Sequence, residues 1–322
     1  MTDPLVAIQV GIAALQDLLL ALVVGSLACD VAQGRASAAT LKQRLATIRR
    51  SATLGLLFAA LVYLWLQAAV MSGSSLLDAA SALAVVITQS HFGSTWSIGC
   101  AGLLLATLGA LARNARCSRW LSGLGAAIYV MGKVGASHAA DGGDFSLAEG
   151  VHWLHVCATA WWVGSVVLAC SVLRALALQS SAAAYLRFAE RLSAGATIAF
   201  ACVVASGVFN VVHIAARTAT PLLHSSYGAL LGFKLTLVAA ATLLATWNRI
   251  GRLPQLRRLG CPASADATAA VTGASRRSTD TERDEYRSAA RSFERTMACE
   301  AVVLVAVVLV AAVLAHTSPT GV

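Results

Sequence analysis

The stretch Leu5–Ala28, LVAIQVGIAALQDLLLALVVGSLA, runs for 24 residues with Asp17 as its only charged side chain. A helix needs about 20 mostly apolar residues to cross a bilayer. Similar stretches recur along the chain, and the sequence predicts an all-α polytopic membrane bundle with eight transmembrane helices. The predicted spans are Leu5–Ala28, Ser51–Met71, Trp96–Ala112, Trp120–Ala140, Val151–Leu173, Leu192–Ala216, Tyr227–Trp247 and Met297–His316.

The composition excludes two other classes of protein. Hydrophobic residues make up 58% of the 322 residues and charged residues 12%, whereas soluble domains carry about 25% charged residues. A disordered chain instead has few hydrophobic and many charged residues. The apolar stretch Leu76–Gln89 is too short to be a ninth span, so we expect an interfacial or re-entrant segment there.

The basic residues predict the orientation of the chain. Twenty-one of the 24 Lys and Arg residues fall in the connections after the first, third, fifth and seventh spans, and only Arg217 falls in the alternate connections. Basic residues gather in cytoplasmic loops, so we expect both termini in the periplasm and the protein in a bacterial inner membrane. The net charge of +9 is then a feature of topology, and no nucleic-acid partner is expected.

Residues 1–322 are predicted to form a single integral membrane domain. Its one sizeable soluble part is the segment 251–296, which is rich in Ala, Ser and Thr and then dense in charge. We expect a flexible basic cytoplasmic loop there, because the segment has little apolar surface to bury.

The seven histidines are predicted to lie toward the outer face. His152 and His155 are three residues apart, so their side chains share one face of a helix. Neutral imidazole binds Cu, Zn, Ni or Fe, and the sequence suggests a metal site among His91, His138, His152, His155 and His213. The simpler alternative is that interfacial histidines only form hydrogen bonds with headgroups or backbone.

Four ionisable residues lie in or near the apolar spans. Such groups are costly in hydrocarbon and usually face the bundle interior, paired or lining a path. Asp17 could pair with Lys133, and Lys234 with Glu300, while the simpler alternatives are that Glu300 sits at the cytoplasmic interface and that Lys234 snorkels. Together with Cys157 and Cys202 they are candidates for a transport path, or only for ties between helices.

Signatures of enzymes and of nucleotide-driven pumps are absent from the sequence. There is no G-x-x-x-x-G-K-[ST] motif, no H-E-x-x-H motif, and no loop long enough for an aspartyl-phosphate domain. No C-x-x-C pair or Met-x-x-Met ladder occurs either. We therefore expect a protein that is not an enzyme.

Several motifs resemble those of the copper resistance protein D family. They are His155–Gly164 (HVCATAWWVG), Ser206-Gly207-Val208, Tyr227–Lys234 (YGALLGFK) with Asn248-Arg249, Glu300, Ser137-His138-Ala139 and Thr88–Gly93 (TQSHFG). The core of the resemblance covers about residues 150–250. Two departures stand out: Gln16-Asp17 stands near the place where many relatives have a His in the first span, and the chain has only four Met.

The resemblance implies an eight-helix inner-membrane protein of copper uptake or copper tolerance, working with a small periplasmic copper-binding protein. On this hypothesis the chain is a permease, and copper of unassigned oxidation state enters at the periplasmic histidines. It then passes inward along polar or thiol groups.

Two alternatives come from other classes of protein. His155 with His138 or His213 could hold one b-type haem near the periplasmic face, which would make an electron-transfer protein. The chain could also be a membrane scaffold that docks a soluble partner.

Overall fold

The computed structural model describes residues 4–34, 39–137, 146–179, 182–217, 225–260 and 274–317. Within these ranges the protein is helical and has no strand, which confirms the all-α class. The helices are α1 (Pro4–Gln33), α2 (Ala39–Ser72), α3 (Ala79–Gln89), α4 (His91–Leu111), α5 (Ala115–Gly135), α6 (Leu147–Gln179), α7 (Ala182–Arg217), α8 (Ser226–Trp247), the π-helical turn η3 (Asn248–Arg252), α9 (Leu253–Gly260) and α10 (Ala274–Ala315).

Seven stretches of helix in the described part of the chain are long and apolar enough to cross a membrane. They lie in α1, α2, α4, α6, α7, α8 with its continuation into α9, and α10. The one predicted span outside this set, Trp120–Ala140, corresponds to α5, which has 21 residues but carries Arg116, Arg119 and Lys133. Helix α3 has 11 residues, in line with the short segment expected between the second and third spans.

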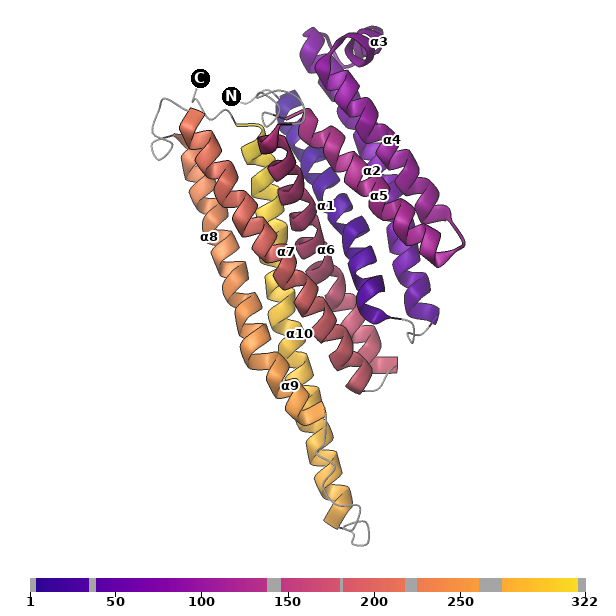
Figure 1. Ribbon diagram of the computed structural model, residues 1–322, viewed down its shortest axis with the longest axis vertical. Helices are drawn as coiled ribbons and strands as arrows, with labels where there is room; N and C mark the ends of the chain where they lie inside the picture. Colours follow the sequence, from indigo (N-terminus) through magenta and orange to yellow (C-terminus); the bar gives the residue numbers. More distant parts are fainter. Residues whose placement is uncertain are drawn as a thin grey trace.

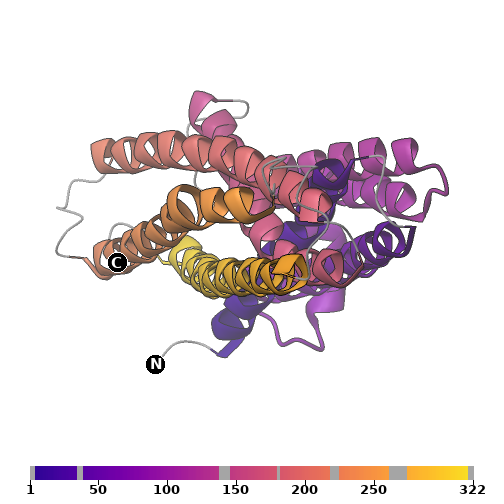
Figure 2. The ribbon, with the colours of Figure 1, turned by 90° about the horizontal axis from the view of Figure 1, so that it is seen from below.

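The helices run roughly parallel and antiparallel along one long axis (Figure 1). At the upper end of this view α1, α4, α6 and α8 begin and α10 ends, while α10 begins at the lower end. Helices α4 and α5 form an antiparallel pair on one side, and α1 packs against α2, α6 and α10. Viewed from below, α10 lies beside α8 (Figure 2).

Two glycines allow α1 and α6 to cross with their backbones in contact. A Cβ atom added at Gly25 would lie 2.2 Å from the carbonyl carbon of Gly164, and one at Gly164 would lie 1.7 Å from the carbonyl oxygen of Ala21. Small residues of this kind let membrane helices approach closely, where dispersion attraction between the backbones is largest. The crossing brings α1 against the helix that carries His152 and His155.

Gly164→Ala is expected to destabilise the bundle, because the new methyl group overlaps α1 and the helices must separate. We expect a loss of about 3 kcal/mol in the free energy of unfolding, at the upper end of over-packing costs. Gly11→Ala is the matched control, since nothing lies within 4 Å of a Cβ at Gly11, and it should be neutral or slightly stabilising. Thermal unfolding in detergent measures both. Equal midpoints for the two variants would contradict the close crossing.

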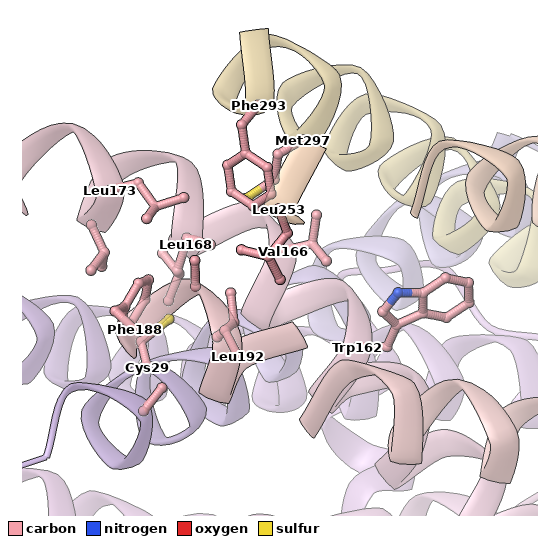
Figure 3. Close-up of a cluster of buried hydrophobic side chains, with 14 of the residues drawn as sticks. Cys29, Trp162, Val166, Leu168, Leu173, Phe188, Leu192, Leu253, Phe293 and Met297 are labelled. Carbon is pink, nitrogen blue, oxygen red and sulfur yellow. The ribbon is translucent and has the colours of Figure 1, made fainter. Parts of the chain in front are cut away.

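The larger hydrophobic cluster joins α1, α6, α7, α9 and α10 (Figure 3). It includes Leu173 of α6, Phe188 of α7, Leu253 of α9, and Phe293 and Met297 of α10. These contacts explain why α10 begins before the apolar stretch Met297–His316. Tyr286, Ala290, Phe293 and Met297 recur every three or four residues and place one face of the helix on this cluster.

The segment 251–296, predicted to be a flexible loop, is largely helical in its described part. Helix α9 covers Leu253–Gly260, and α10 begins at Ala274, 23 residues before the predicted start of the last span at Met297. The segment is helical because the apolar stripe of α10 packs on the larger cluster. The stripe is hard to recognise in the sequence, since its few apolar residues are separated by charged ones. Residues 261–273 lie outside the described residues.

Candidate functional site

Two imidazoles face one another on α6. The rings of His152 and His155 are stacked, with centroids 6.3 Å apart and planes inclined by 10°. Their spacing of one helical turn produces this arrangement, as the sequence predicts. His155 lies about 12 Å along α6 from the beginning of the helix, because each residue adds about 1.5 Å.

Helix α7 fixes the tautomer of His155. The Ser206 hydroxyl donates its hydrogen to the carbonyl oxygen of Cys202, so toward His155 its oxygen acts as an acceptor. The Nδ1 atom of His155 lies 3.0 Å from Ser206 Oγ and therefore carries the hydrogen. The lone pair is then on Nε2, which is the form of imidazole that binds a metal ion.

Asn210, one turn beyond Ser206 on α7, supports the second imidazole. Its side-chain nitrogen lies 3.3 Å from Nδ1 of His152. An Asn amide carries both a donor and an acceptor, so it can serve either tautomer of the imidazole. Helix α7 thus presents one polar partner to each histidine, and such partners orient metal-binding imidazoles.

Lys234 of α8 adds a positive charge near this pair. Its ammonium group interacts electrostatically with both His152 and His155. It makes no hydrogen bond or ion pair with a residue in the described part of the chain. The suggested pair of Lys234 with Glu300 is therefore not formed, and Glu300 is buried within α10.

A cavity of about 960 Å³, lined by both apolar and polar side chains, opens among α1, α2, α4, α5 and the end of α10. Asp17 and Lys133 line it and form the predicted ion pair. Next to them Tyr129 donates a hydrogen bond to Gln16 Oε1 at 3.2 Å, and Gln16 Nε2 donates to the carbonyl of Ala59 at 3.0 Å. Buried polar groups must be paired in this way inside an apolar bundle.

The cavity also contains two histidines near its upper rim. His316 Nδ1 donates to the carbonyl of Ala312 at 2.8 Å, so its Nε2 accepts a hydrogen bond from Tyr63 at 3.3 Å. His91, at the start of α4, lines the same cavity. Helix α1, which contributes Asp17 to the cavity, packs against α6, which carries the histidine pair.

The predicted metal-site residues thus fall in separate places. His152 and His155 lie together, while His91 lies in the cavity. His213 stacks on Phe209, with centroids 5.8 Å apart. His138 lies outside the described residues. Among the described residues no group of three or more His, Cys, Asp or Glu side chains is arranged to hold a metal ion.

The two predicted thiols lie in different hydrophobic clusters. Cys157 packs with the cluster of α1, α2 and α5, and Cys202 with the larger cluster of Figure 3. Sequence reasoning also missed the partners Ser206, Asn210 and Tyr63. A signal was available for the first two, since they are four residues apart and share a face of α7.

Comparisons with known proteins agree on one family. Residues 186–314 match the sequence model "Copper resistance protein D", and residues 1–147 match "Copper resistance protein D-like, N-terminal domain". The chain is 28% identical over 261 residues to copper resistance protein D of Pseudomonas syringae pv. tomato, covering 78% of this chain and 76% of the relative. No solved structure matches the chain.

The two family matches cover most of the chain, and the described part contains seven helices of membrane-spanning length and composition. The motifs that resemble the family include the helix with the paired histidines and the helix with Ser206. The chain therefore belongs to the copper resistance protein D family and is a multi-pass membrane protein of copper resistance.

Proposed function

We propose that this protein is a permease that moves copper ions across the bacterial inner membrane, in copper uptake or copper tolerance. The observation that carries the proposal is the pair His152 and His155, stacked and supported by Ser206 and Asn210 inside apolar helices. Polar side chains at this depth are costly and usually serve function. The relative from Pseudomonas syringae is named for copper resistance.

Two imidazoles suit a transient copper site. Permanent structural metal sites are closed by four protein ligands, whereas a permease must release its ion. Imidazole is a ligand for copper in either oxidation state, so the geometry favours copper without assigning its charge. The remaining ligands would be water or groups carried in with the ion.

We propose eight transmembrane helices, with α5 as the eighth and both termini in the periplasm. Helix α5 has 21 residues, enough for a span, and lies antiparallel to α4, which has the same length. Its Lys133 is neutralised by Asp17. Arg116 and Arg119 lie at its beginning, on the side where the other basic residues gather, and this side is cytoplasmic by the positive-inside rule.

The cavity supplies a route from the periplasm toward the histidine pair. It is lined by His91, at the start of α4, and by His316, just beyond the end of α10, and both of these helix ends lie at the upper end of Figure 1. Asp17 also lines it, and α1, which carries Asp17, packs against the helix of the pair. A small periplasmic copper-binding protein is the proposed donor to this rim. No nucleotide is needed if copper moves down its gradient, and the protein is then not an enzyme.

Ser206→Ala is expected to weaken copper binding by about 10- to 100-fold, because it removes the group that fixes the His155 tautomer. Asn210→Leu should weaken it similarly through His152. Isothermal titration of the purified protein with copper measures the affinity. Ser206→Thr retains the hydroxyl and should bind like the wild type, so equal affinity in the Ala and Thr variants would contradict the tautomer argument.

Metal analysis and an absorption spectrum of one purified sample test the proposed function. At equilibrium with free copper, we expect copper bound in a fixed ratio to protein, and lost in the His152→Ala/His155→Ala variant. Protein that retains no copper above the level of empty detergent micelles would contradict the proposal.

A further inference from the structure

A second pocket, of about 350 Å³, lies at the other end of the bundle between α6, α7 and α10. Three arginines line it, and two tyrosines and one carboxylate complete its polar lining: Arg174, Arg287, Arg291, Tyr185, Tyr286 and Glu294. Alanine and leucine side chains of α6, α7 and α10 form the rest of the wall. The pocket thus joins an apolar wall to a strongly basic edge.

Two of the three arginines have no ion pair within the described part of the chain. Among the described residues Glu294 is the one carboxylate of the lining, and it accepts a hydrogen bond from the hydroxyl of Tyr185 at 3.3 Å. Arg287 lies 3.5 Å from Asp284, and both side chains are more than two-thirds exposed. Arg174 and Arg291 have no ion pair or hydrogen bond with any described residue.

A buried hydroxyl also lacks a partner in this pocket. The Tyr286 oxygen is inaccessible to solvent and forms no hydrogen bond within the part of the chain that the structure describes. Its ring packs edge-on against Tyr185, with centroids 6.4 Å apart, so the side chain is held in place. The two tyrosine rings therefore form a fixed part of the pocket wall.

The position of the pocket along α6 indicates where it meets the membrane. Arg174 and His152 are 22 residues apart on this helix, which corresponds to about 33 Å. The hydrocarbon core of a bilayer is about 30 Å thick. If His152 lies near the periplasmic boundary, Arg174 lies at the level of the cytoplasmic headgroups.

We propose that this pocket binds the phosphate of an anionic phospholipid headgroup from the cytoplasmic leaflet, between Arg174 and Arg291. Guanidinium groups match phosphate oxygens in charge and geometry. The alanine and leucine wall contacts the start of the acyl chains. The lipid joins α6 to the charged part of α10. The proposal rests on the proposed topology but does not involve copper.

The test uses the full chain in mixed micelles with increasing phosphatidylglycerol. Thermal unfolding of the protein is monitored by its tryptophan fluorescence. We expect a saturable rise in the unfolding midpoint that phosphatidylcholine does not produce. Arg174→Gln/Arg291→Gln should weaken the apparent affinity about thirtyfold, since each arginine near an anionic headgroup contributes about a factor of five. Native mass spectrometry of the same samples counts the retained lipid.

Arg44→Gln/Arg258→Gln is the matched control, because these arginines are exposed, lie in the predicted cytoplasmic connections and do not line the pocket. Its affinity should equal that of the wild type. Equal losses in both double variants would overturn the proposal in favour of general surface charge. Saturation by inorganic phosphate, with no further effect of phosphatidylglycerol, would overturn the lipid source and leave a free-phosphate site.

Arg174→Gln alone keeps the test decisive if the double variant does not fold. Its side chain is exposed, so without lipid the variant should be as stable as the wild type. With phosphatidylglycerol its affinity should be about fivefold weaker. An unchanged affinity would contradict the role of Arg174 in binding phosphate.

Discussion

The His152→Ala/His155→Ala variant is expected to lose copper transport completely. Both predicted ligands disappear, and Ser206 and Asn210 cannot replace them because neutral hydroxyl and amide groups are poor copper ligands. His155→Ala alone should lower the uptake rate by more than the 10- to 100-fold that is typical of losing a supporting partner. Initial uptake rates in proteoliposomes, measured by mass-resolved copper, give the size of each effect.

Leu154→Ala is the matched control for this experiment. It lies on the same helix between the two histidines, and its side chain is 42% exposed, away from the pair. It should transport copper at the wild-type rate. If the double histidine variant is folded and transports copper as well as Leu154→Ala does, the histidine pair is not on the route.

Asp17→Asn is expected to destabilise the protein by about 2 kcal/mol. The change leaves the Lys133 ammonium without its counter-ion inside the bundle. A fully buried pair would cost about 3–5 kcal/mol, but the two side chains retain 28% and 25% exposure, so the loss is smaller. Unfolding in mixed detergent micelles of increasing denaturing strength measures the change.

The double variant Asp17→Asn/Lys133→Met separates a structural role from a transport role. Removing both charges relieves the unpaired ammonium, so stability should return to within about 1 kcal/mol of the wild type. If the pair lines the copper route, uptake stays low in this stable variant. Recovery of both stability and uptake would show that the pair only ties α1 to α5.

The sequence predicts the helices well because a membrane span has a strong and local signal. About 20 apolar residues are needed whatever their neighbours are, and α1, α2, α4, α6, α7 and α8 contain the predicted spans. The early start of α10 was missed because its stripe from Tyr286 to Met297 lies within charged residues. There the helix depends on packing against α6, α7 and α9.

The site was predictable only where its residues are close in sequence, or where an unpaired charge in the bundle would cost too much free energy. His152 and His155 share a face by helical spacing, and Asp17 needed a cation, so both pairs were predictable. Glu300 was a candidate partner for Lys234, and only the helix order in space decides that the two do not pair. Tyr63 and His316 are 253 residues apart, and no local pattern indicates that they meet.

Copper uptake by the wild-type protein is the most direct test of the central claim. The purified chain is reconstituted in liposomes of bacterial lipid, copper is added outside, and the copper retained inside is measured over time. The account predicts time-dependent, saturable accumulation that is abolished by His152→Ala/His155→Ala and unchanged by Leu154→Ala. Accumulation no faster than in protein-free liposomes would contradict it.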